Sequence, residues 1–258
     1  MAAERRVSSA TVRARKGTRF PVVTAYDAPF ARCVEASGID VILVGDSLGM
    51  VVLGYDATIP VETDDMCRHA GAVVRGTSRA HVIVDMPFGS YEPSDSGAVR
   101  TAVKLVKCGA TSVKLEGGSP RAAERISAIV QAGIPVVAHI GVLPQTAAAG
   151  AGFRRKQDRD VLLAEARAVT QAGAFAVVLE MVEPAIAGEL TATIDIPTIG
   201  IGAGPACDAQ VLVMHDLLGL YAEAPPFAKR YAELATVATG ALRSYADEVR
   251  AGVFPAST

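Results

Sequence analysis

Short apolar runs recur along the chain, each preceded by a glycine and, before that, by a polar, alanine-rich segment. A glycine after a helix readily takes the left-handed conformation that ends it. A short Val, Ile and Leu run without alternation is typical of a strand buried on both faces. We therefore expect repeated helix–glycine–strand units. The glycines are Gly38, Gly76, Gly109, Gly133 and Gly173, and the strands are Ile39–Val44, His81–Val84, Thr111–Leu115, Ile134–Ala138 and Ala174–Leu179.

The number of these units predicts the fold. Three further runs fit strands, at Phe20–Ala25, Ile196–Ile201 and Gln210–Met214. About eight βα units in 258 residues, without an intervening linker, match the size of a closed (β/α)8 TIM barrel of the α/β class. An open, doubly wound sheet is the alternative. We expect residues 1–19 to form an N-terminal arm and residues 20–258 the catalytic barrel, closed by a helix over Phe227–Ala251.

Charge and cysteine content narrow the class of protein. The chain has 27 acidic and 25 basic residues, which argues against a nucleic-acid surface built on bulk charge. No apolar run approaches the ~18 residues that cross a bilayer. The four cysteines form no CxxC pair, so neither a zinc ribbon nor a disulfide framework is indicated, and a reduced, cytoplasmic compartment is expected. The basic residues before position 20 predict a short solvated helix or arm, with a transit peptide as the alternative, and no apolar segment typical of a secretion signal is present.

A polar residue stands at the end of each of the five strands that follow the glycines. The carboxyl ends of parallel strands open onto one face of a barrel, where barrel enzymes have their chemistry. A single acid there could cap a helix, but five polar ends, four of them acidic, are poorly explained that way. We expect these side chains to converge. They are Asp46, Asp85, Glu116, His139 and Glu180.

This set of oxygen ligands favours Mg²⁺ over zinc, because neither cysteine nor histidine clusters with it. Converging carboxylates repel one another unless a cation or a proton intervenes. A divalent ion bound by Asp46 and Asp85, with Glu116 near it, would relieve that repulsion. Lys114 shares a strand face with Glu116 and could supply positive charge for a substrate carboxylate, or could extend from the barrel rim into solvent.

Other motifs carry weaker signals. The glycines of residues 200–204 lack both the GxGxxG spacing and a Walker lysine, so they predict a tight turn at the barrel mouth. His69, His81 and His215 have no metal-ligand spacing and are expected to be structural. Ser47 lies in no GxSxG nucleophile motif.

In its ordered set of motifs, the sequence resembles the ketopantoate hydroxymethyltransferase family. The resemblance runs from about residue 20 to 255, and VGDSLGM followed by KLEGG is its most specific part. The matching blocks are TAYDAPFA at 24–31, VGDSLGMVVLGYDATIPV at 44–61, DMPFGSY at 85–91, KLEGG at 114–118, PVVAHIG at 135–141, VLEMV at 178–182, IGIGAG at 199–204 and QVLVMHDLLGL at 210–220.

The resemblance implies a Mg²⁺-dependent (β/α)8 transferase of pantothenate biosynthesis. Such an enzyme transfers a hydroxymethyl group from 5,10-methylenetetrahydrofolate, its co-substrate, to 3-methyl-2-oxobutanoate, giving 2-dehydropantoate. It implies that Asp46 and Asp85 ligate the metal, that Glu116 completes the metal's environment and that Glu180 accepts a proton. Cytoplasmic homo-oligomers, often decamers, are typical of the family. The residues implied to contact the 2-oxo acid are Asp46, Ser47, Asp85, Lys114 and His139.

The sequence departs from the family pattern in several places, the first of them after the His139 strand. After His139 the chain has GVLPQ at 141–145, then an alanine-rich stretch, then FRRKQ at 153–157 instead of a glycine-rich loop. The side chain of the 2-oxo acid and the strength of folate binding therefore stay open. A Mg²⁺-dependent aldolase or lyase of the same barrel type, acting on another 2-oxo acid, is the alternative activity. A non-catalytic barrel serving as an assembly subunit is the alternative from a different class.

Overall fold

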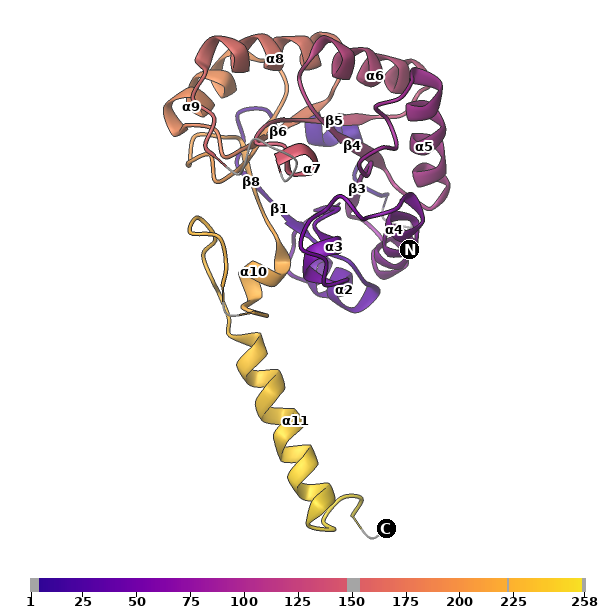
Figure 1. The fold of residues 1–258 in the computed structure, drawn as a ribbon, viewed down its shortest axis with the longest axis vertical. Helices are drawn as coiled ribbons and strands as arrows, with labels where there is room; N and C mark the ends of the chain where they lie inside the picture. Colours follow the sequence, from indigo (N-terminus) through magenta and orange to yellow (C-terminus); the bar gives the residue numbers. More distant parts are fainter. Residues whose placement is uncertain (1–4, 148–153, 222, 257–258) are drawn as a thin grey trace. The chain divides into compact units, whose positions relative to one another are not determined.

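The computed structural model describes residues 5–147, 154–221 and 223–256. It divides into two compact units, Met1–Val211 and Leu212–Thr258. The first contains nearly all of a closed barrel in which each parallel strand pairs with the next along the chain, as Figure 1 shows. The (β/α)8 prediction is therefore confirmed, and the open sheet is excluded. The strands are β1 (Phe20–Thr24), β2 (Val41–Val44), β3 (His81–Asp85), β4 (Ser112–Glu116), β5 (Val136–Gly141), β6 (Ala176–Glu180), β7 (Thr198–Ile201) and β8 (Ala209–Leu212).

The strands form where the apolar runs predicted them. Every residue of β2, β3, β4 and β5 is buried, as expected for strands covered by helices outside and by side chains inside. Successive strands pair in regular register, with Val84 opposite Val44 and Val113 opposite Val84. The ring closes where the backbone N–H of Phe20 donates to the carbonyl of Asp208 at 3.2 Å. This closure brings the carboxyl ends of the strands together at one mouth.

Helices surround the strands on the outside of the barrel (Figure 1). Several begin at a polar cap, because the first backbone N–H groups of a helix lack partners within it. Asp27, Ser94, Ser119 and Asp158 each accept such a hydrogen bond. The helices are α2 (Ala28–Ala36), α3 (Leu48–Val51), α4 (Thr63–Gly76), α5 (Asp95–Lys107), α6 (Pro120–Gln131), α7 (Pro144–Thr146), α8 (Arg159–Gln171) and α9 (Pro184–Thr193).

Four of the five predicted cap glycines have the left-handed conformation expected of them, and Gly76 does not. Gly38, Gly109, Gly133 and Gly173 have φ angles between 85° and 108°. Gly76 is instead the last residue of α4, which ends at an extended Thr77. A Cβ at position 76 would lie 2.6 Å from the carbonyl oxygen of Ala28. Gly76 therefore lets α4 approach α2, and the prediction of a helix cap there is wrong.

The segment before β1 is packed more closely than a solvated arm. Its helix α1 (Ser9–Arg13) has one fully buried side chain, Val12, which joins a core cluster with Phe20 and Val22. The guanidinium of Arg15 pairs with the carboxylate of Asp40 at 2.5 Å. These contacts fix the segment against the barrel.

The second unit contains α10 (Met214–Leu218) and α11 (Leu234–Arg250). The predicted terminal helix therefore forms, but it begins at Leu234 and not at Phe227. None of its residues is buried, and Leu242 and Tyr245 are more than half exposed. That this helix closes the barrel stays a prediction. In the described residues no helix is both long and apolar enough to cross a membrane.

Candidate active site

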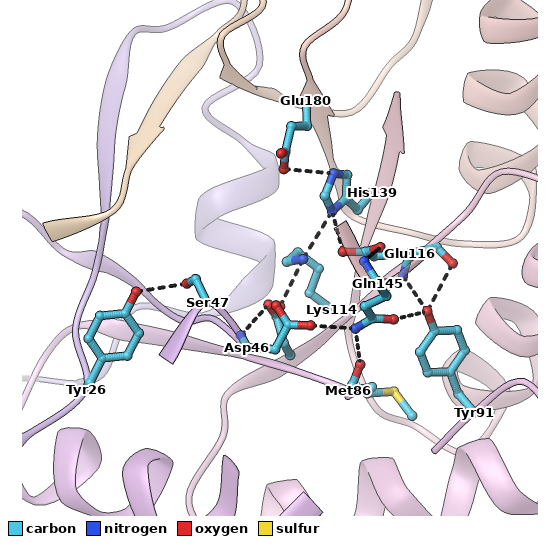
Figure 2. A network of polar contacts seen from close by, with 11 residues as sticks. Tyr26, Asp46, Ser47, Met86, Tyr91, Lys114, Glu116, His139, Gln145 and Glu180 are labelled. Atoms are coloured by element: carbon cyan, nitrogen blue, oxygen red, sulfur yellow. Dashed lines mark hydrogen bonds and ion pairs between the residues drawn. The ribbon is translucent and has the colours of Figure 1, made fainter. Parts of the chain in front are cut away.

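The five predicted strand-end residues meet at the barrel mouth, as expected. Asp85, Glu116 and Glu180 end their strands, His139 lies within β5, and Asp46 follows β2 by two residues. Four of the five are buried, with Glu180 the most open. Figure 2 shows His139 between Glu180 and Glu116, with Lys114 and Asp46 close by. The strand ends therefore supply a compact polar cluster inside an apolar barrel.

Two aspartates and a lysine form the deepest part of the cluster. The backbone N–H of Asp46 donates to Oδ2 of Asp85 at 3.0 Å. The ammonium of Lys114 lies 3.1 Å from Oδ1 of Asp85. Although burial opposes its charge, the carboxylates of Asp85, Glu116 and Asp46 raise the pKa of Lys114, which stays an ammonium. Lys114 thus points into the site and not toward the rim.

Both aspartates are poor acids in this environment. Burial first, and the neighbouring Asp85 second, raise the pKa of Asp46 to about 7. Burial also raises the pKa of Asp85, against the opposing charge of Lys114. Burial and the repulsion between the carboxylates raise the two pKa values more than the positive charge of Lys114 lowers them. The two aspartates would therefore be stabilised as anions by a further positive charge.

This donor set fits a divalent cation. Oδ1 of Asp85 is buried and accepts no hydrogen bond of good geometry from the described residues. Within those residues no three Asp, Glu, His or Cys side chains converge as a complete metal site. Mg²⁺ commonly needs only one or two protein carboxylates, with water and substrate oxygens completing its octahedron. Asp46 and Asp85 meet that requirement.

His139 connects the aspartate side of the site to Glu180. Its Nδ1 lies 3.2 Å from Nζ of Lys114 and 3.6 Å from Oε1 of Glu116, and its Nε2 lies 3.4 Å from Oε2 of Glu180. Burial and the charge of Lys114 hold the pKa of His139 well below its usual value, so the ring is neutral. Burial raises the pKa of Glu180 to about 7 and that of Glu116 well above normal.

Gln145 and Tyr91, which were not predicted as site residues, hold the carboxylates in place. The side-chain amide of Gln145 donates to Oδ2 of Asp46 at 2.8 Å and to the carbonyl of Met86 at 2.9 Å. The backbone N–H of Gln145 donates to Oε2 of Glu116 at 3.1 Å. The hydroxyl of Tyr91 donates to the side-chain Oε1 of Gln145 at 2.6 Å. The signal available in the sequence was a polar side chain in the loop directly after the His139 strand.

Ser47 lies on the other side of Asp46 and is oriented by Tyr26. The two hydroxyl oxygens are 2.9 Å apart. Burial raises the pKa of Tyr26, which is therefore a neutral phenol at physiological pH. Tyr26 belongs to the TAYD block, but its contact with Ser47 could not be predicted from that block. Ser47 is thus a positioned hydrogen-bonding group beside the acids.

The weaker motifs have structural roles, as expected. Residues 202 and 204 are glycines with φ of 61° and 80°, in the turn that follows β7. His81 lies 2.8 Å from the hydroxyl of Ser112 through Nε2, and Nδ1 of His69 is 2.6 Å from the carbonyl of Tyr26. Neither histidine is among the residues of the polar network in Figure 2.

Known structures share the architecture of this chain. A crystal structure of phosphonopyruvate hydrolase, in complex with oxalate and Mg²⁺, matches with a TM-score of 0.64 at 16% identity, over 96% of this chain and 88% of that one. A crystal structure of 2,3-dimethylmalate lyase matches with a TM-score of 0.62 at 17% identity, over 96% of this chain and 89% of that one. At these identities the likeness extends to the fold alone.

Sequence relatives are much closer. A 3-methyl-2-oxobutanoate hydroxymethyltransferase of Ignicoccus hospitalis is 49% identical over 93% of this chain and 93% of the relative. One of Pyrobaculum aerophilum is 52% identical over 90% of each chain. The sequence profile of ketopantoate hydroxymethyltransferase matches residues 6–257. With the strand-end acids arranged as described, these matches establish that the chain belongs to the ketopantoate hydroxymethyltransferase family.

Proposed function

We propose that this protein is a 3-methyl-2-oxobutanoate hydroxymethyltransferase. It transfers a one-carbon unit from 5,10-methylenetetrahydrofolate to 3-methyl-2-oxobutanoate and forms 2-dehydropantoate. The observation that carries the proposal is the pairing of two buried aspartates and Lys114 with an acid of raised pKa, Glu180, across one barrel mouth. The first group suits an anionic, chelating substrate, and the second suits proton removal from it.

Binding of the 2-oxo acid uses charge and hydrogen bonding. The buried ammonium of Lys114 attracts the substrate carboxylate, in a site where few other charges are positive. The Ser47 hydroxyl, held by Tyr26, offers a further hydrogen bond. Asp46 and Asp85 would hold Mg²⁺, and Glu116 would complete its environment through the Gln145 loop. When bound, that ion supplies Lewis-acid stabilisation of negative charge on the substrate's keto oxygen.

Glu180 is the proton acceptor in this mechanism. A general base works best when its pKa lies near the operating pH, and burial raises the pKa of Glu180 to about 7. Glu180 removes the C3 proton, and the enolate forms. His139, neutral and 3.4 Å away, contacts Glu180 and the substrate and orients both. The C3 carbon then bonds to the one-carbon unit, whose bonds to N5 and N10 of the folate break, and water supplies the hydroxyl oxygen of the product. Tetrahydrofolate leaves with two protons on these nitrogens, one from water and one from C3 by way of Glu180.

Deuterium exchange at C3 of 3-methyl-2-oxobutanoate tests the proton-removal step separately from the one-carbon transfer. We expect exchange that requires Mg²⁺ but not folate, and product formation only when 5,10-methylenetetrahydrofolate is added. Absence of exchange with Mg²⁺ present would refute the proposed base and metal. Exchange followed by transfer from a free aldehyde, but not from folate, would instead support the alternative Mg²⁺-dependent aldolase.

We further propose that the enzyme works as a cytoplasmic homo-oligomer, in keeping with its family. Its four cysteines are free thiols, as a reducing compartment would leave them. The exposed apolar side chains of α11, among them Val237 and Leu242, support a subunit contact. Sedimentation velocity on the purified protein measures the assembly, and a monomer would exclude it.

A further inference from the structure

Two cavities lie beside the carboxylate cluster and share part of their walls. One, of about 220 Å³, is lined by Phe88, Tyr91 and Glu116 and by the start of α6. The other, of about 240 Å³, is lined by Val142, Lys156 and the first turns of α8. Leu143, Thr146 and Glu165 line both. The two cavities therefore adjoin at these three side chains, and we call the two together the groove.

The short helix α7 lies between this groove and Asp46, while Glu116 borders both the groove and the reacting centre. Gln145 is buried and turns its amide toward Asp46. Its neighbours Leu143 and Thr146 face the groove. Glu116 belongs to both regions, since it lines the first cavity and accepts a hydrogen bond from the Gln145 backbone. A molecule in the groove would thus lie next to the 2-oxo acid without displacing it.

Glu165 is the charged side chain that lines both cavities, and the mechanism leaves it unused. It lies on α8, which neighbours α6 on the outside of the barrel (Figure 1). The backbone of Gly118 packs so tightly on Glu165 that a Cβ there would come within 2.4 Å of its Cβ. Burial raises the pKa of Glu165, and Lys156 opposes that shift. The stem of the side chain therefore packs on the Gly118 backbone, and the side chain lines both cavities.

The chemistry around Glu165 suits the second substrate better than the first. A 2-oxo acid is an anion, and the half-buried carboxylate of Glu165 would repel it, although Arg121, Arg125 and Lys156 also line the groove. A reduced pterin is a flat ring system whose 2-amino group and N3–H are two adjacent, parallel donors. A carboxylate offers two acceptors at the matching spacing. Apolar walls with a few convergent polar groups are typical of sites for such rings.

We propose that the groove binds the pterin ring of the folate co-substrate and that Glu165 accepts hydrogen bonds from its 2-amino and N3–H groups. The inference rests on the proposed function, because it assigns a site to the second substrate of that reaction. It gives Glu165 a role in specificity for the one-carbon donor, distinct from the proton transfer by Glu180. The bound ring would present its one-carbon unit toward Glu116 and the enolate.

The test combines Glu165→Gln with two probes, tetrahydrofolate and 6-methyltetrahydropterin, which lacks the aminobenzoyl-glutamate tail. Gln keeps the size of Glu but turns one acceptor into a donor, so we expect calorimetric Kd values for both probes to rise roughly 10- to 100-fold. Mg²⁺-dependent C3 exchange, which needs no folate, should stay within about twofold of wild type. Asp160→Asn is the matched control, since that acid lies on the same helix with 89% of its side chain exposed.

The outcomes separate this inference from the proposed function. Loss of exchange in wild-type enzyme would refute the proposed function, whatever Glu165 does. Normal exchange with unchanged Kd for both probes in Glu165→Gln would overturn the pterin site. Weakening confined to tetrahydrofolate would also overturn it, because Glu165 would then act on the tail. Equal weakening of both probes, with Asp160→Asn unchanged, supports it.

Discussion

Nε2 of His139 lies 3.4 Å from Oε2 of Glu180, while Nδ1 of the same ring lies 3.2 Å from the Lys114 ammonium. An ammonium can only donate, so Nδ1 is the acceptor, and the neutral ring carries its proton on Nε2. At 3.4 Å from Oε2 of Glu180, Nε2 makes no hydrogen bond of good geometry with the described residues. A protonated Nε2 cannot accept a proton, so His139 does not compete with Glu180 for the substrate's proton.

Glu180→Gln should abolish most of the proton transfer. Gln has nearly the same volume but cannot accept the proton, so C3 exchange should fall roughly 10²–10⁴-fold, mostly in kcat. Calorimetry should still detect 2-oxo acid and Mg²⁺ binding, because Lys114, Asp46 and Asp85 are unchanged. Glu124→Gln, on the exposed face of α6, is the control. If the variant is folded, binds substrate and exchanges normally, another residue is the base, and His139 is the first candidate.

The exchange rate should depend on pH through Glu180. Burial raises the pKa of Glu180 to about 7, and only the ionised carboxylate accepts a proton. With Mg²⁺ and substrate saturating, the rate should rise with pH up to about 7 and level off above it. The residual exchange rate of Glu180→Gln should not show this rise with pH. A rate that is flat from about pH 6 to 8 would mean a pKa near the ordinary value of about 4.3.

Asp46→Asn and Asp85→Asn should each weaken Mg²⁺ binding by roughly 100-fold or more, since hard cations depend on charged oxygens. Exchange activity should fall in parallel at ordinary Mg²⁺ concentrations. Asp64→Asn removes an exposed acid on α4 and serves as the control. Thermal melting checks the fold of each variant. Unchanged calorimetric Mg²⁺ affinity in both variants would contradict the metal assignment.

Gly76→Ala should destabilise the barrel although Ala is the better helix former. The new Cβ would lie 2.6 Å from the backbone oxygen of Ala28, so α2 and α4 must separate, at a cost of about 1–3 kcal/mol. Gly240→Ala is the matched control, because that glycine lies inside α11 with open space around it. Urea unfolding should show a loss only for Gly76→Ala. Equal stability of the two variants would remove the packing explanation.

The strand-end residues could be predicted from the sequence because all strands of a parallel barrel end on the same face. Asp46 and Glu180 are 134 residues apart in the chain, yet each follows a buried apolar run and so reaches the same mouth. Gln145 and Tyr91 could not be found in this way, since their contacts depend on how two loops fold over the mouth. Gly76 was misjudged because the reason for its glycine is a neighbouring helix and not its own backbone.

The last prediction concerns the bond between Tyr91 and Gln145, which fixes Asp46. Gln145→Leu would leave buried polar groups on Asp46, Met86 and Tyr91 without their partner, at about 1–3 kcal/mol each before relaxation. We expect a total loss of about 2–4 kcal/mol in unfolding free energy, and Mg²⁺ affinity reduced roughly 10- to 100-fold as Asp46 loses its orientation. Tyr91→Phe, which removes one hydroxyl, should cost about 1 kcal/mol.

The double variant distinguishes a connected network from two independent contacts. If Tyr91 acts through Gln145, removing both should cost less than the two single losses added together, by at least about 0.5 kcal/mol. Urea unfolding without Mg²⁺ gives the stabilities, and calorimetry gives the affinities. Additive stability losses, or a Gln145→Leu variant with wild-type Mg²⁺ affinity, would show that the loop does not position Asp46. Coupling in both measurements would make Gln145 a positioning residue for the metal-binding carboxylate.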